Sequence, residues 1–125
     1  MIKRPLHPRF TPAVLSGRKT TTIRDKPWPL ATPIMLYNWS GAAYRSLQVN
    51  VAPILVTTVN RVHISRHLDG TMLYAYNRNA DNQATSLWET EGFDTRLDMD
   101  LWFSALLKPG QSVTKSLMRF HLKTT

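Results

Sequence analysis

The feature that most constrains the fold is the middle of the chain, where apolar residues alternate with polar ones or run together. The segments IMLYNWS (34–40) and SLQVNVAPILVTTVNRV (46–62) are rich in β-branched and aromatic residues, which is typical of strands. A turn around Gly41 separates them, and HLDG (67–70) indicates a tight turn into TMLYAY (71–76). The middle of the chain is therefore predicted to be a meander of antiparallel strands.

Helices are predicted on both sides of this meander. In TPAVLSGRK (11–19), Thr11 is placed to cap a short helix, Pro12 suits its first turn and Gly17 ends it. In LWETEGFDTRLDMDLWFSALLKPG (87–110), apolar residues recur near helical spacing before a Pro-Gly stop. We expect three leucines of this helix to cover one end of the sheet: Leu97, Leu101 and Leu106.

The last segment, KSLMRFHL (115–122), alternates Met118, Phe120 and Leu122 with polar residues and predicts a closing strand with those three side chains inward. The polar, Asn-rich stretch 77–86 predicts a mobile loop or a short, poor helix. We therefore expect one α+β domain over residues 1–125: a small barrel-like sheet of about five to six mostly antiparallel strands with two or three packed helices.

The composition narrows the possible functions. The net charge of +8 favours nucleic acid, nucleotides or an anionic surface as partner. The chain has no cysteine, which excludes disulfides, thiolate metal sites and a cysteine nucleophile. The N-terminal residues MIKRPLHPRF do not resemble a signal peptide, and no run of about 20 apolar residues is present. We therefore expect a soluble, cytoplasmic protein.

Two further patterns have an ordinary and a functional interpretation. His63 and His67 are four residues apart, as a metal pair on a helix would be, but they follow a strand and enter a turn without a third ligand, which favours surface histidines. Most of the aromatic residues are expected in the core. Trp28 lies between prolines beside a basic cluster, so it is the candidate for stacking an unpaired base.

The stretch GRKTTTIRD (17–25) crowds basic residues around three threonines. The ordinary interpretation is a solvated lysine at the start of a strand. A catalytic interpretation requires that burial lower the pKa of Lys19, so that its neutral amine can act as a base toward a threonine hydroxyl. It also requires a carboxylate to handle the proton of the leaving group, and Glu91 in ETEGF is placed for this role between a polar turn and an apolar helix.

The order of these motifs resembles that of ASCH domains, a branch of the PUA-like fold. The resemblance depends on GRKTTTIRD after a short helix and on Glu91-Gly92-Phe93 before a later helix, and it spans nearly the whole chain. Within that family, the opening motif is most similar to that of the small bacterial N4-acetylcytidine amidohydrolases. The resemblance implies a PUA-like barrel, with Lys19 as catalytic lysine, Thr22 as nucleophile and Glu91 as acid.

From this resemblance we expect a hydrolase that acts on the acyl amide of N4-acetylcytidine and needs no metal or organic cofactor. A non-catalytic RNA-binding module and a ribonuclease are the alternatives, since the family also includes such members. The positive charge is expected to form one face around the opening motif. The residues expected to bind the substrate or RNA are Arg18, Thr20, Thr21, Arg24, Lys26 and Trp28.

One geometric difficulty concerns the spacing of the lysine and the nucleophile. In a regular strand, Lys19 and Thr21 share a face while Thr22 points to the other. The spacing of three therefore requires a turn or bulge at the start of the strand, which Gly17 permits. Thr20 and Thr21 remain alternatives as the reactive hydroxyl.

Overall fold

The computed structural model describes residues 1–77 and 87–123 and has an α+β fold. The strands are β1 (Ile2–Pro5), β2 (Thr21–Arg24), β3 (Ile34–Trp39), β4 (Gln48–Arg66), β5 (Met72–Tyr76) and β6 (Ser112–Leu122). A 3-10 turn (Pro8–Phe10) leads into the first of the α-helices, which are α1 (Thr11–Leu15), α2 (Leu87–Thr90) and α3 (Arg96–Ser104). The predicted fold class and numbers of elements are confirmed for the described residues. The predicted Asn-rich loop lies almost entirely outside them, at 78–86.

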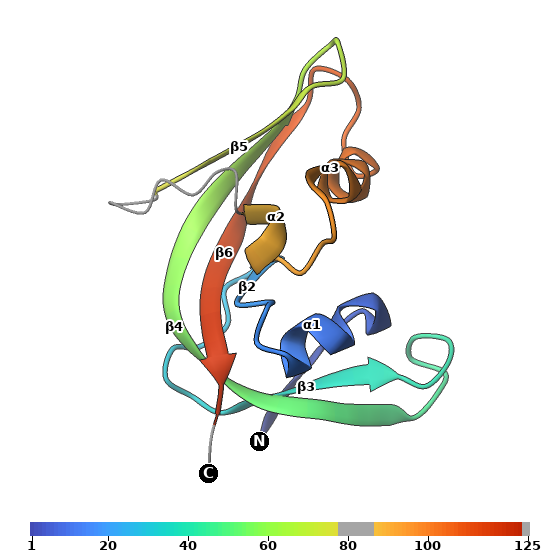
Figure 1. Ribbon diagram of the computed structural model, residues 1–125, viewed down its shortest axis with the longest axis vertical. Coiled ribbons are helices and arrows are strands. Elements are labelled where there is room, and N and C mark those ends of the chain that lie inside the picture. Colours follow the sequence, from blue (N-terminus) through green and yellow to red (C-terminus); the bar gives the residue numbers. More distant parts are fainter. Residues whose placement is uncertain (78–86, 124–125) are drawn as a thin grey trace.

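The strands form one mixed sheet in the order β1-β3-β4-β6-β2, with β5 paired to β4. Among the described strands, β1 and β3 pair in parallel, and the other pairs are antiparallel. Strand β4 is 19 residues long, and it pairs with β3 near its start and with β5 near its end. Strand β4 is curved along its length, and the helices lie on the concave side of the sheet (Figure 1).

The sheet is not closed into a barrel, which corrects the expected architecture. Register shifts between Leu36 and Tyr37 and between Val56 and Thr58 let the sheet curl, because a bulge increases the local twist of a strand. However, within residues 1–77 and 87–123, β1 pairs only with β3 and β2 pairs only with β6, and each of these end strands has four residues. The two ends of the curled sheet therefore do not meet.

The core lies on the concave side of the sheet. Ile34, Ile54, Val56, Met118 and Phe120 are all 3% exposed or less, so the inward positions predicted for Met118 and Phe120 are confirmed. Leu122 is partly buried and packs against the same core. This buried apolar surface is the main source of stability in a domain of this size.

The prediction for the leucines near α3 is wrong. Leu97, Leu101 and Leu106 are 65%, 60% and 57% exposed, whereas Met99 and Phe103 are buried. The side chain of Thr95 caps the helix by accepting a hydrogen bond from the Asp98 amide. The buried pair is four residues apart, as expected for one face of a helix, and the leucines of α3 lie on another face.

Helix α1 forms where the sequence predicts it, with Pro12 in its first turn and Gly17 beyond its end in a left-handed conformation, φ 81°. Thr11, however, is not the cap. It is the first residue of the helix, and its hydroxyl donates to Oδ1 of Asn38 on β3 over 2.9 Å. None of the described helices is long and apolar enough to cross a membrane.

Candidate functional site

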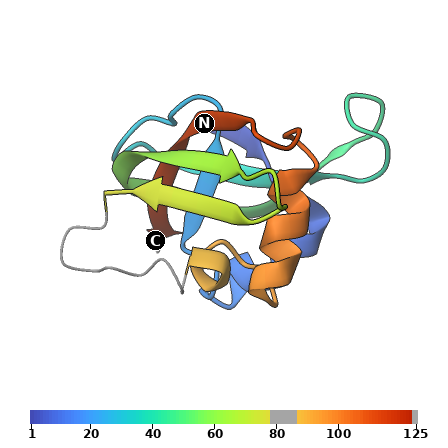
Figure 2. The ribbon, with the colours of Figure 1, turned by 90° about the horizontal axis from the view of Figure 1, so that it is seen from above.

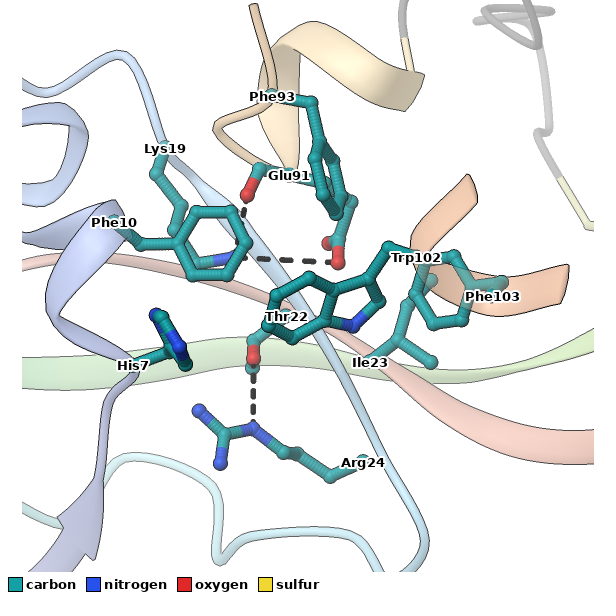
Figure 3. A pocket seen from close by; sticks show the side chains of 10 residues that line it. All are labelled: His7, Phe10, Lys19, Thr22, Ile23, Arg24, Glu91, Phe93, Trp102 and Phe103. Atoms are coloured by element: carbon teal, nitrogen blue, oxygen red, sulfur yellow. Dashed lines mark hydrogen bonds and ion pairs between the residues drawn. The ribbon is translucent and has the colours of Figure 1, made fainter. Parts of the chain in front are cut away.

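The opening motif forms the start of β2 and the segment that leads into it. Strand β2 begins only at Thr21, so Lys19 and Thr20 precede the regular strand. The Lys19 amide donates to the carbonyl of Ala13 over 2.9 Å, and the Thr20 amide donates to the carbonyl of Thr90 over 2.8 Å. Because Lys19 is held by α1 rather than by the sheet, strand alternation does not fix the direction of its side chain. The expected turn is therefore present, and Lys19 and Thr22 line the same cavity (Figure 3).

This cavity has a volume of about 150 Å³. An apolar cavity of roughly that size can hold a six-membered aromatic ring. All three residues predicted to be catalytic line it, together with one further cation, one histidine and several apolar side chains. The complete set is His7, Phe10, Lys19, Thr22, Ile23, Arg24, Glu91, Phe93, Trp102 and Phe103.

Lys19 is a buried cation, 4% exposed. Its Nζ donates to the carbonyl oxygens of Thr21 over 2.8 Å and of Glu91 over 2.7 Å, and it lies 4.8 Å from the ring centroid of Phe10. Burial lowers the pKa of Lys19 to about 8; the Glu91 carboxylate opposes this shift and Arg24 adds to it. A lysine with this pKa has an appreciable fraction of neutral amine near neutral pH.

Glu91 reaches the same place from the turn that follows α2. One of its carboxylate oxygens, Oε1, lies 3.9 Å from Nζ of Lys19. The other, Oε2, accepts a short hydrogen bond of 2.5 Å from the hydroxyl of Thr21, which also lies 3.0 Å from the hydroxyl of Thr90. Glu91 is 3% exposed, so this carboxylate is removed from water and held by defined partners.

Thr22 and Arg24 form a second polar pair at the cavity. Nε of Arg24 donates to the Thr22 hydroxyl oxygen over 2.9 Å. Burial lowers the pKa of Arg24, although a guanidinium remains protonated under ordinary conditions. A donated hydrogen bond from a cation favours negative charge on the oxygen that accepts it, so Arg24 makes the Thr22 hydroxyl easier to deprotonate.

Trp28 does not fit its predicted role as a base-stacking residue. It is 6% exposed, and the guanidinium carbon of Arg24 lies 4.6 Å from its ring centroid. Its amide contacts the sulfur of Met118 over 3.0 Å. The ring of Trp28 therefore packs in the core and against the Arg24 guanidinium.

Gly92 explains the EGF motif. It has φ 92°, and a Cβ atom at this position would lie 3.2 Å from Cβ and Cδ of Lys19 and from the ring of Phe10. Glycine is therefore required both by the backbone conformation and by the close approach of the turn to Lys19. Arg18 fixes the same turn from outside, because its guanidinium donates to the carbonyls of Phe93 over 2.8 Å and Gly92 over 3.2 Å.

The basic residues of the opening motif do not make one exposed face, which corrects that expectation. Lys19 is buried, Arg24 lines the cavity, and Arg18 holds the turn and pairs with Asp94. Lys26 is exposed and does not line the cavity, and Thr20 contributes its backbone to the joint between β6 and α2. Of the residues expected to bind substrate, Arg24 alone lines the cavity.

Sequence reasoning missed the aromatic wall of the cavity. Phe10 is 5.1 Å from Phe93 and 5.4 Å from Trp102 between ring centroids, and His7 is 5.3 Å from Trp102, all in edge-on arrangements. These rings come from three separate segments. Phe93 could have been predicted as a site residue because it follows Gly92 in the EGF motif. His7 and Phe10 lie in a segment without periodicity, so no sequence signal points to them.

His63 and His67 are exposed, in agreement with the surface interpretation. In residues 1–77 and 87–123, no three His, Asp or Glu side chains are grouped so that they could hold a metal ion. Comparisons of the chain with protein-family models, with curated proteins and with solved structures find no match. The chemistry of the cavity is therefore argued from its own residues: a buried amine, a hydroxyl paired with a guanidinium, and a buried carboxylate.

Proposed function

We propose that this protein is an amidohydrolase that removes the acyl group from N4-acetylcytidine or a closely related modified nucleoside. The observation that carries the proposal is the joint placement of Lys19, Thr22 and Glu91 in one aromatic-walled cavity. The resemblance of GRKTTTIRD and EGF to the ASCH domain family supports the same assignment of roles. We also propose that the fold, in which the sheet is open, is PUA-like.

In the first half of the reaction, the neutral amine of Lys19 takes the proton of the Thr22 hydroxyl, and the oxygen attacks the acetyl carbonyl. Nε of Arg24 donates to the Thr22 oxygen over 2.9 Å, so the guanidinium stabilises the negative charge that develops on this oxygen as its proton leaves. The C–N bond breaks as the tetrahedral intermediate collapses. The departing N4 receives a proton, so cytidine leaves and the acetyl group remains as an ester on Thr22.

Glu91 is the residue proposed to return the proton. Its Oε1 lies 3.9 Å from Nζ of Lys19, a distance at which the two form an ion pair, so the carboxylate has to approach the ammonium before it accepts the proton and passes it to the leaving nitrogen. In the second half, Lys19 takes a proton from the attacking water, the ester C–O bond breaks, and the Thr22 oxygen receives that proton. The product leaves as acetic acid, which ionises in water. The aromatic wall suits a planar pyrimidine, because aromatic pairs favour edge-on and offset contacts.

A second candidate is a binding pocket without turnover, and the hydrogen bonds of Lys19 favour it. Both carbonyl acceptors stabilise the ammonium form, which is a ligand for an anion or a base oxygen and is not a general base. In this case the pocket would hold a phosphate or an extruded base of RNA. A ribonuclease would use the same groups on a ribose hydroxyl and a phosphodiester.

The test is to incubate purified protein with N4-acetylcytidine, with and without a chelator. The hydrolase proposal predicts release of equal amounts of cytidine and acetate, unchanged by the chelator. Lys19→Arg should abolish turnover because guanidinium cannot supply a neutral base, and Glu91→Gln should slow it by about 10²-fold or more. Intact nucleoside after incubation with wild-type protein would rule out the hydrolase; RNA binding or RNA cleavage in parallel assays would then select between the two alternatives.

A further inference from the structure

The hairpin that joins β3 to β4 projects from the body of the protein (Figure 2). Residues 37–48, here called the aromatic hairpin, carry a row of rings. The ring centroids of Tyr37 and Trp39 are 5.3 Å apart, and those of Trp39 and Tyr44 are also 5.3 Å apart. Tyr37 is 7% exposed and Tyr44 is 86% exposed, so the row leads from the body to an open ring at the tip.

The tip is held in shape by its own hydrogen bonds. The Ser40 amide donates to the carbonyl of Leu47 over 2.8 Å, the Arg45 amide to the carbonyl of Ala42 over 3.1 Å, and the Gly41 amide to the Ser46 hydroxyl over 2.9 Å. Tyr44 has φ 64°, a left-handed conformation that is uncommon for a bulky residue. The turn therefore presents a large aromatic side chain to water at a conformational cost.

The aromatic hairpin and the strands of the described sheet carry basic residues and no acidic ones. All Asp and Glu residues lie at position 25, at position 69, and between 81 and 100, so residues 26–68 and all six strands have none. Arg45 is exposed at the tip. On β1, Lys3 lies directly opposite Met35 of β3, which shares a face with Tyr37 and Trp39 because side chains alternate along a strand.

This face is separate from the cavity. Helix α1 lies on the other face of β3, where Thr11 bonds to Asn38. None of the residues of the aromatic hairpin lines the cavity that holds Lys19. Any ligand of the hairpin would therefore bind independently of the pocket chemistry.

We propose that the aromatic hairpin binds single-stranded nucleic acid. Tyr44 and Trp39 stack on unpaired bases, and Arg45 and Lys3 contact the phosphates. Flat rings beside cations, on a hairpin whose own residues include no carboxylate, match a ligand that alternates bases with negative charges. This inference goes beyond hydrolysis of a nucleoside and does not depend on it.

The experiment measures fluorescence anisotropy of labelled single-stranded RNA and DNA of the same sequence, about 12 nucleotides long. Tyr44→Gly is the informative variant, because it removes the ring while glycine adopts the left-handed backbone readily. Leu47→Ala is the matched control, since Leu47 is 78% exposed in the same turn but has no ring. Trp39→Phe retains an aromatic face.

The expected result is at least about fivefold weaker binding for Tyr44→Gly, less than about twofold change for Leu47→Ala, and an unchanged or higher melting temperature for Tyr44→Gly. Binding should weaken as salt rises. Preference for the RNA or the DNA oligonucleotide identifies which of the two is the ligand. Equal affinity of Tyr44→Gly and wild type, or binding to phosphatidylserine vesicles in place of both oligonucleotides, overturns the proposal.

Failure here is distinguishable from failure of the proposed hydrolase. Tyr44→Gly should hydrolyse N4-acetylcytidine at the wild-type rate, because Tyr44 does not line the cavity. Thr22→Val should bind the oligonucleotides as wild type does, even where it cannot hydrolyse the nucleoside.

Discussion

The cavity and the aromatic hairpin both combine aromatic rings with cations, but they differ in their contact with water. In the cavity, Lys19 is 4% exposed and its amine is held by two carbonyl oxygens. In the hairpin, Tyr44 is 86% exposed and Arg45 lies beside it in solvent. Removal from water changes the pKa of a group and strengthens its interactions, whereas an exposed charge is screened. The same residue types are thus suited to chemistry in one region and to binding in the other.

The difference also extends to the partners of each polar group. Around the cavity, Thr21, Thr22 and Glu91 each have a defined hydrogen-bond partner, which fixes the positions of these side chains. In the hairpin, the hydrogen bonds shape the turn and leave the ring of Tyr44 outward. The polar groups around the cavity are thus held in place by hydrogen bonds, whereas the hairpin exposes an aromatic surface to solvent.

The largest expected difference between the two regions is in the pH dependence of stability. The pKa of Lys19 is about 8 in the folded protein, against an ordinary value of 10.5, so between these values the unfolded chain binds more protons. The free energy of unfolding of wild type relative to Lys19→Met should therefore rise by about 3 kcal/mol from pH 8 to pH 10.5. Denaturant unfolding at several pH values measures this.

Arg45→Met in the hairpin is the control, because an exposed arginine stays protonated in both states over this pH range. Its stability relative to wild type should be independent of pH. A flat difference for Lys19→Met as well would contradict the burial argument for the cavity.

A smaller difference is expected between two glycines, one from each region. Gly92→Ala places a Cβ 3.2 Å from Lys19 and Phe10 at φ 92°, and should cost about 2 kcal/mol or more. Gly41→Ala meets only Ser46 at 3.5 Å, and its φ is not left-handed, so it should change stability by less than about 0.5 kcal/mol. Thermal and denaturant unfolding of the two variants compare them. Equal costs would show that the turn at Gly92 is not packed as tightly as described.

Much of the site could be predicted from the sequence because its motif is local. Lys19, Thr22 and Arg24 lie within six residues, and Glu91 and Gly92 are adjacent, so a short pattern is enough to name them. The sequence could state only what a shared cavity would require, namely a turn that frees Lys19 from the alternation of the strand. Whether this turn forms depends on the hydrogen bond from the Lys19 amide to Ala13 in α1. That contact is tertiary, and spacing alone does not reveal it.

Other parts of the fold could not be predicted for similar reasons. The leucine spacing of α3 competes with Met99 and Phe103 for the buried face, and the sheet decides between the two sets. Closure into a barrel depends on whether β1 and β2 meet, which the sequence of neither strand specifies. Trp28 next to basic residues was as compatible with packing on Arg24 as with stacking on a base.

The central claim is that Thr22 carries the acyl group while its neighbour Thr21 only holds Glu91. The most direct test measures cytidine release from N4-acetylcytidine by Thr22→Val, Thr22→Ser and Thr21→Val side by side. The account predicts a loss of at least about 10³-fold for Thr22→Val, residual activity for Thr22→Ser, and a loss of only about tenfold for Thr21→Val, which removes the hydrogen bond to Oε2 of Glu91. Wild-type turnover by Thr22→Val, or a complete loss confined to Thr21→Val, would contradict it.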